Sequence, residues 1–246
     1  MTPMQQILLG TGAGKTYYSN DFDGSSELII PCANGNLNYN ASGNITIEFW
    51  AYLDTLNNNN KSYQTLVGRW DGTNGYCWSL DTNKNDGDLN LYIGNGTNYV
   101  QSEHAPDGTL SAGQWYHIAV VKNGASSPNS KIYVDGTAVH SFGWNVANSN
   151  NSTAVAVGNN YPDASNYGSS LDGRISNFRF MHGAVYTSNF TPPTEPFEGN
   201  YGGNAMFILC RDDSPTTAHL NTLGVGGNPT TITQNGGVTS STDNPF

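Results

Sequence analysis

Two carboxylates facing each other across a cleft would allow this chain to hydrolyse a glycosidic bond. Its glutamates are few and scattered: Glu27, Glu48, Glu103, Glu195 and Glu198. Glu48 lies in the run TIEFWAYL and has no carboxylate two or four residues further along. The pattern predicts that Glu48 is a lone polar residue on one face of a strand. No catalytic residue is assigned, and we expect a protein that is not an enzyme.

Two other runs have some of the residues of nucleotide and calcium sites. Gly10–Thr16 ends in Gly-Lys-Thr, but the position that must hold the first glycine of a P-loop is Leu9. Asp81–Asp88 has acidic and amide side chains at alternate positions, as an EF-hand does. Its required glycine position is Asp86 and its bidentate carboxylate position is Tyr92. The first run therefore predicts a hinge and the second a polar hairpin loop.

The elements that must position any site are strands. In residues 45–53 the apolar residues alternate with Thr46, Glu48, Trp50 and Tyr52, the period of a half-buried strand. No stretch shows a helical stripe, and Asp-Gly turns separate the runs, so the prediction is an all-β, two-sheet antiparallel sandwich. Residues 205–211 are expected to return to the sandwich as a strand that lies beside the first strand of the chain. Further strands are predicted at residues 63–70, 76–80, 88–94, 115–122, 131–136, 152–158 and 174–181.

Composition and charge limit the classes of partner that this chain is expected to bind. The 246 residues carry a net charge of -10, and only 11% of them are charged, so no cluster of basic residues is available for nucleic acid. No apolar run is long enough to span a membrane, and no signal peptide is visible. The three cysteines, Cys32, Cys77 and Cys210, cannot all pair and are predicted to be buried free thiols.

Several segments carry a family resemblance: FDGSSELIIP from Phe22, ITIEFWAYL, the pair GQWYHIAVV and KIYVDG, and Ser170–Phe197. Together they resemble the laminin-G-like, concanavalin-A-like jelly-roll family, in a variant found in structural proteins of tailed phages, especially marine ones. The resemblance covers about Phe22–Pro196. It implies one jelly-roll domain over residues 19–246, closed by residues 198–246, after an N-terminal arm of residues 1–18.

The same resemblance implies a virion protein, either a capsid-surface accessory or a tail-associated adhesin. Its partners would be other virion proteins, and host-surface polysaccharide is a second expected partner. Attachment to the particle is assigned to Met4, Ile7, Leu8 and Leu9 of the apolar arm. A homo-oligomer on the particle is left open. The alternatives are a stand-alone carbohydrate-binding module and, third, a glycoside hydrolase or lyase.

Aromatic and amide side chains gather in the polar loops between residues 142 and 170. Aromatic faces stack on sugar rings and amides bind their hydroxyls, so this region is the predicted glycan surface. The alternative is that the rings pin long loops onto the sandwich. The assigned residues are Trp144, Asn159, Asn160, Tyr161 and Tyr167.

No cofactor is expected, with one alternative. Relatives in the family often hold a structural Ca²⁺ at the rim of the sandwich, and the resemblance makes Asp23, Asp163 and Asp172 the candidate ligands here. Asp23 and Asp172 each precede a glycine, and Asp-Gly is also ordinary turn chemistry.

Overall fold

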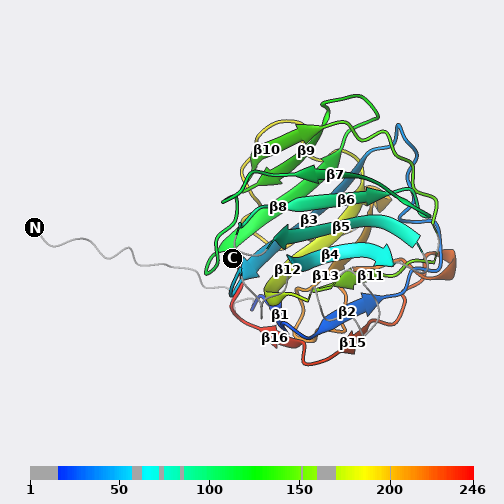
Figure 1. Ribbon diagram of the computed structural model, residues 1–246. Coiled ribbons are helices and arrows are strands. Elements are labelled where there is room, and N and C mark those ends of the chain that lie inside the picture. The colour runs from blue at the N-terminus through cyan, green and yellow to red at the C-terminus, as the bar shows by residue number, and fades with distance from the viewer. Residues whose placement is uncertain are drawn as a thin grey trace, which may run out of the picture.

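The computed structural model describes residues 16–56, 63–71, 75–83, 86–150, 152–159, 170–199 and 201–246. Antiparallel strands in two stacked sheets form nearly all of its regular structure (Figure 1). The predicted all-β, two-sheet sandwich is therefore confirmed. No helix within the described residues is both long and apolar enough to cross a lipid bilayer.

Within the described residues, one sheet has nine strands. They are β1 (Ser19–Asp23), β3 (Ile45–Leu53), β8 (Trp115–Lys122), β9 (Ser130–Val134), β10 (Thr137–Phe142), β12 (Asp172–His182), β13 (Ala205–Leu209), β14 (Leu220–Asn221) and β16 (Thr239–Ser241). Their order is β10-β9-β8-β3-β12-β1-β16, with β13 beside β12 and β14 beside β13.

The other sheet has seven strands in the part of the chain that the structure describes. They are β2 (Glu27–Ile30), β4 (Tyr63–Asp71), β5 (Gly75–Asn83), β6 (Asn90–Gly94), β7 (Tyr99–His104), β11 (Val155–Val157) and β15 (Thr233–Asn235). Their order is β15-β2-β11-β4-β5-β6-β7. Two 3-10 turns, η2 (Tyr201–Gly203) and η3 (Val225–Gly227), lie between the C-terminal strands.

Two features of this topology differ from the prediction. The strand β13 pairs with β12 and β14, whereas β16 takes the position beside β1. The expectation that residues 205–211 lie beside the first strand is therefore wrong. The strand β7 was not predicted, because it is an edge strand of mostly polar, partly exposed residues and lacks an alternating apolar face.

The hairpin between β9 and β10 turns at Asp135 and Gly136, whose φ angles are 48° and 74°. Two successive positive φ values define the tight hairpin turn that Asp-Gly favours. A Cβ added at Gly136 would lie 1.9 Å from the carbonyl oxygen of Phe190, so both the turn and this close approach require glycine.

The core lies between the sheets. Alternate residues of β3, from Ile45 to Leu53, are buried in it, as the period-two pattern predicts. Trp78 of β5 contacts Phe178 and Phe180 of β12, with ring centroids 6.4 and 6.3 Å apart. Aromatic side chains therefore join the two sheets. The three cysteines are buried and free, as predicted.

The strand β12 keeps its apolar side chains in the core by means of a bulge. The register with β3 shifts between Ser176 and Arg179, and Asn177 there has a φ of 51°. Asparagine tolerates this left-handed conformation better than most residues. The extra residue allows Ile175 and Phe178 both to face the core and turns Arg179 to the opposite side.

Part of the outer face of the nine-stranded sheet is covered by the segment after β12. Ala119, Val121 and Tyr133 pack there against Tyr186 and Phe190, whose own rings stack with centroids 3.5 Å apart. This cover buries polar residues of β3 and β8 that alternation alone would place in solvent.

Candidate functional site

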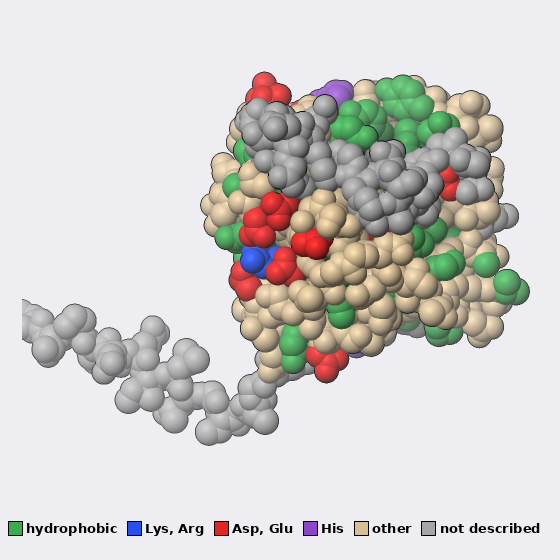
Figure 2. All heavy atoms as spheres, turned by 60° about the horizontal axis from the view of Figure 1, so that its bottom comes forward, with side chains coloured by type: hydrophobic (Ala, Val, Ile, Leu, Met, Phe, Trp, Pro, Cys, Tyr) green, Lys and Arg blue, Asp and Glu red, His purple; other side chains and the backbone are tan. Residues whose placement is uncertain are grey.

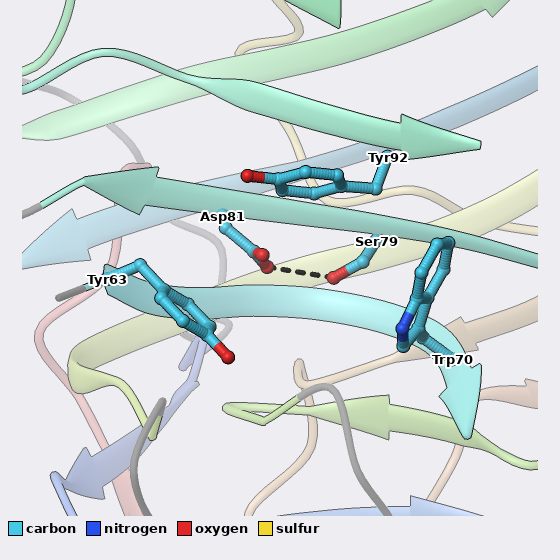
Figure 3. Close-up of a pocket in the computed structure, with 5 residues that line it drawn as sticks. All are labelled: Tyr63, Trp70, Ser79, Asp81 and Tyr92. Atoms are coloured by element: carbon cyan, nitrogen blue, oxygen red, sulfur yellow. Dashed lines mark hydrogen bonds between the residues drawn. The ribbon is translucent and has the colours of Figure 1, made fainter. Parts of the chain in front are cut away.

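A pocket of about 200 Å³ lies on the outer face of the seven-stranded sheet (Figure 3). Tyr63 and Trp70 come from β4, Ser79 and Asp81 from β5, and Tyr92 from β6. Figure 3 shows the three aromatic side chains around the Ser79–Asp81 pair. The pocket therefore has a polar floor and aromatic walls.

Strand alternation explains how these residues meet. Ser79 and Asp81 are separated by Leu80, which faces the core, so both project from the outer face of β5. Tyr92 likewise lies between two core residues of β6, and its Cα is paired with that of Ser79. The pairing of the two strands is what brings the tyrosine over the serine and the aspartate.

Asp81 is the chemically distinctive member of the pocket. It is only 3% exposed, and its Oδ1 accepts a hydrogen bond of 2.8 Å from the hydroxyl of Ser79. Burial raises the pKa of the Asp81 carboxyl to about 7, while the hydroxyls of Ser79 and Thr65 act in the opposite direction. The group can therefore accept or donate a hydrogen bond near neutral pH.

The aromatic wall extends beyond the pocket. The ring of Trp70 lies 4.8 Å from Tyr76, 6.2 Å from Tyr92 and 6.1 Å from Tyr99, measured between centroids. Tyr99, on the edge strand β7, is 49% exposed. These four rings form a continuous aromatic surface, which we call the aromatic strip, from the pocket to the edge of the sheet.

The polar residues beside the pocket are already bonded to one another. Asp88 is buried and accepts hydrogen bonds from the backbone and side-chain nitrogens of Asn83 and from the amide of Asn90. Asn90 is in turn paired across the sheet with His104. Among the residues that line the pocket, Asp81 is the one carboxylate, so they do not supply the acid pair of a glycosidase.

The predicted glycan residues lie elsewhere. Trp144 is fully buried, with its ring centroid 5.7 Å from that of Tyr39 and 6.0 Å from that of Phe142. A buried ring offers no face to a sugar, so the burial of Trp144 argues against the predicted stacking role and fits the alternative, that the ring pins a loop. Asn159 is also fully buried. Asn160, Tyr161 and Tyr167 lie outside the described residues.

Two of the three predicted calcium ligands lie side by side. Asp23 of β1 and Asp172 of β12 are Cα partners, whereas Asp163 lies outside the described residues. The carboxylate of Asp23 accepts hydrogen bonds from the backbone and hydroxyl of Ser25, which makes it a turn cap. In the described ranges no group of three or more His, Cys, Asp or Glu side chains is arranged to hold a metal, so the calcium site stays a prediction.

Close to Asp23 and Asp172, the negative charge of three other aspartates is balanced by an arginine side chain. Arg174 lies within 3.8, 3.2 and 3.5 Å of carboxylate oxygens of Asp21, Asp54 and Asp243, respectively. Figure 2 shows a face of the molecule on which acidic side chains gather beside a basic one, among mostly uncharged polar groups and backbone. The guanidinium group takes the place that a bound cation would have among these acids.

The sequence pattern alone does not indicate the pocket. In the sequence, Asp81 stands as the first residue of a calcium-like loop and Tyr92 at the missing ligand position of that loop. The alternation of β5 and β6 was a usable signal, because it places Ser79, Asp81 and Tyr92 on one side of their strands. Which strands are neighbours was not visible in the sequence. The arm residues Met4, Ile7, Leu8 and Leu9 lie outside the described residues.

Comparison with known proteins identifies the family. The profile of the Concanavalin A-like lectin/glucanases superfamily, in its laminin G variant, matches residues 22–188, and the chain belongs to this superfamily. The predicted laminin-G-like, concanavalin-A-like jelly roll is thereby confirmed. No curated protein matches the chain.

Solved structures show the same fold at low sequence identity. A Bacteroides ovatus protein, provisionally described as carbohydrate binding, is 16% identical with a TM-score of 0.56, covering 94% of this chain and 62% of its own. The receptor binding domain of botulinum neurotoxin mosaic serotype C/D is 15% identical with a TM-score of 0.51, covering 71% and 40%. The botulinum neurotoxin serotype D binding domain is 14% identical, also with a TM-score of 0.51, covering 72% and 42%. The chain thus spans less than two thirds of each of these three chains.

Proposed function

We propose that this protein binds carbohydrate, without cleaving it, at the pocket formed by Tyr63, Trp70, Ser79, Asp81 and Tyr92. The observation that carries the proposal is the combination of partly exposed aromatic rings with a buried carboxyl and a hydroxyl on one sheet face. Aromatic rings stack on the apolar faces of sugars, and the carboxyl and hydroxyl bind sugar hydroxyls. The superfamily, which includes lectins, supports the same class of ligand.

Replacing Trp70 by alanine is expected to weaken glycan binding by about tenfold or more. Truncating a central aromatic residue of a binding surface costs more than about 1.4 kcal/mol, which corresponds to this factor. Binding would be found on a glycan array with the purified chain and then measured by isothermal titration calorimetry.

Trp115→Ala is the matched control for this experiment. Trp115 is a partly exposed tryptophan of β8 in the opposite sheet, where it lies 5.6 Å from Tyr52 and donates a hydrogen bond to Asp243. It should leave the affinity unchanged. Equal losses in the two variants would contradict the assignment of the pocket. Release of reducing ends from the bound polysaccharide would show that the protein is a hydrolase or lyase.

We further propose that the domain is displayed on a phage particle, as a capsid-surface accessory or a tail-associated adhesin that attaches to host-surface glycans. The support is the phage-type sequence resemblance and the apolar residues Met4, Ile7, Leu8 and Leu9. The described strands of both sheets run from Ser19 to Ser241.

Deletion of residues 1–15 is expected to abolish incorporation into particles while leaving a soluble domain with an unchanged melting temperature. Tyr17 and Tyr18 are retained, because Tyr17 contacts Phe246 and Glu195, and the carbonyl of Tyr18 accepts a hydrogen bond from Ser176. Incorporation is measured by co-sedimentation with purified particles. Normal incorporation of the shortened chain would refute the attachment role. The proposal that the pocket binds glycan does not depend on that result.

A further inference from the structure

The pocket contains a buried acid for which the described part of the chain provides no counter-charge. Each Lys and Arg of that part is engaged elsewhere. Arg174, Arg179 and Arg211 are ion-paired with other acids, and Lys122, Lys131 and Arg69 donate to backbone carbonyls. None of the six lines the pocket.

The charged and titratable groups that face Asp81 can be named element by element. They are Tyr63 from β4, Tyr92 from β6 and, across Asn90, Asp88 and His104. Burial, followed by the negative charge of Asp81, raises the pKa of Tyr92, so this tyrosine stays neutral. Asp88 is bonded to amides of Asn83 and Asn90. Among the described residues that line the pocket, none is a Lys, Arg or His that could pair with the charge of Asp81.

Both the buried carboxyl of Asp81 and the aromatic rings of the pocket favour a positively charged group. Ionising a buried carboxyl costs free energy, and a cation brought beside it recovers that cost, whereas a neutral hydroxyl recovers only part of it. Aromatic rings attract cations through their π faces, most strongly where water is excluded. At about 200 Å³ the pocket is smaller than sites for drug-sized ligands, which suits one sugar ring.

On this basis we propose that the pocket selects an amino sugar whose nitrogen is not acetylated, with the ammonium group at Asp81 and the sugar ring against the aromatic walls. This inference rests on the proposed carbohydrate-binding function and specifies its ligand class. The net charge of -10 would assist by attracting cationic saccharides over a longer range.

The test compares three β-1,4-linked tetramers, of glucosamine, N-acetylglucosamine and glucose, by calorimetry with the full chain at pH 7. The glucosamine tetramer should bind at least tenfold more tightly than either of the others. Ethanolamine, which has the amine without the ring, should bind at least tenfold more weakly than the glucosamine tetramer. In the Asp81→Asn variant, which keeps the side-chain shape, the ratio of the affinity for the glucosamine tetramer to that for either other tetramer should fall to about one.

Lowering the pH from 7 to 5 protonates Asp81, so affinity for the glucosamine tetramer should fall while affinity for the glucose tetramer should not. The titration of Asp81 itself, followed by NMR, should lie near neutrality in the free protein and move down when glucosamine tetramer is added. A value well below 4 in the free protein would show that the chain provides its own counter-charge and would overturn the inference.

Two outcomes separate this inference from the proposed function. Equal or tighter binding of the acetylated or glucose tetramer, or a preference that survives Asp81→Asn, would refute amine recognition and leave carbohydrate binding intact. If no tetramer and no array glycan binds the wild-type chain, the proposed function itself fails. A melting-temperature measurement on Asp81→Asn confirms that the variant is folded before its binding is compared.

Discussion

Replacing Glu48 by alanine is expected to lower the free energy of unfolding by about 3–5 kcal/mol, the cost of breaking a buried ion pair. Glu48 is fully buried on the covered face of the nine-stranded sheet. Arg179 donates to its Oε1 at 2.5 Å, Tyr186 donates to its Oε2 at 2.9 Å, and His117 Nε2 lies 3.3 Å from Oε2. Removing the carboxylate leaves the buried guanidinium of Arg179 without its counter-charge.

The same cluster predicts a dependence of stability on pH. Burial opposes ionisation of Glu48, but His117 and Arg179 outweigh it and hold the pKa of the carboxyl below its ordinary value. A lowered folded-state pKa means that the contribution is complete above the unfolded-state value of about 4.3 and is lost as the pH falls through the folded-state value. The difference in stability between wild type and Glu48→Gln should therefore narrow below about pH 4.3.

The control is Glu103→Ala. Glu103 pairs with His140 at 2.7 Å, but the two side chains are 21% and 30% exposed. Exposed ion pairs contribute about 0–1 kcal/mol, so this loss should be much smaller. Urea denaturation of both variants gives the comparison. A loss below about 1 kcal/mol for Glu48→Ala, or one equal to that of Glu103→Ala, would contradict this account of the cluster.

Trp144→Ala is expected to destabilise the fold by about 3–5 kcal/mol, the usual cost of emptying the space of a large buried aromatic side chain. Trp144 is fully buried and lies against Tyr39 and Phe142. The loop after β10 is therefore anchored to the sandwich by this ring. Urea denaturation measures the loss, with Tyr99→Ala, an exposed aromatic residue, expected within about 0.5 kcal/mol of wild type.

This substitution also distinguishes anchoring from ligand binding. At a temperature where Trp144→Ala is still folded, its glycan affinity should equal that of wild type, because the residue does not reach the pocket surface. A large loss of affinity with little loss of stability would restore Trp144 as a ligand contact. Trp144→Phe, which keeps an aromatic ring in the site, should lose less stability than Trp144→Ala.

The glycan surface predicted around Trp144 and the observed pocket lie at different places in the fold, and the reason is physical. A tryptophan in a polar loop is ambiguous in sequence, because the same apolar area stacks on a sugar or packs against the core. Burial decided between the two, and it depends on Tyr39 and Phe142, which are far from each other in the chain. Asp81 and Trp70 are similarly separated by ten residues and come to line one pocket only through the pairing of β4 with β5.

The sequence by itself determined the strands with an apolar face, though not the polar edge strand β7, and it marked the hairpin turn. The period-two pattern of β3 identified its core face, and Asp135-Gly136 identified the positive-φ turn, because both depend on local backbone geometry. The sequence segments shared with the superfamily also specified the jelly roll.

Only the tertiary structure decided which polar residues are buried and which meet. Alternation predicted that Glu48 lies alone on a strand face, whereas the segment containing Tyr186 and Phe190 covers that face, and the bulge at Asn177 turns Arg179 toward the carboxylate. Burial and strand order are long-range properties, set by packing between segments distant in the chain. The same two properties created the pocket, by placing Asp81 in a low-dielectric position under the aromatic walls.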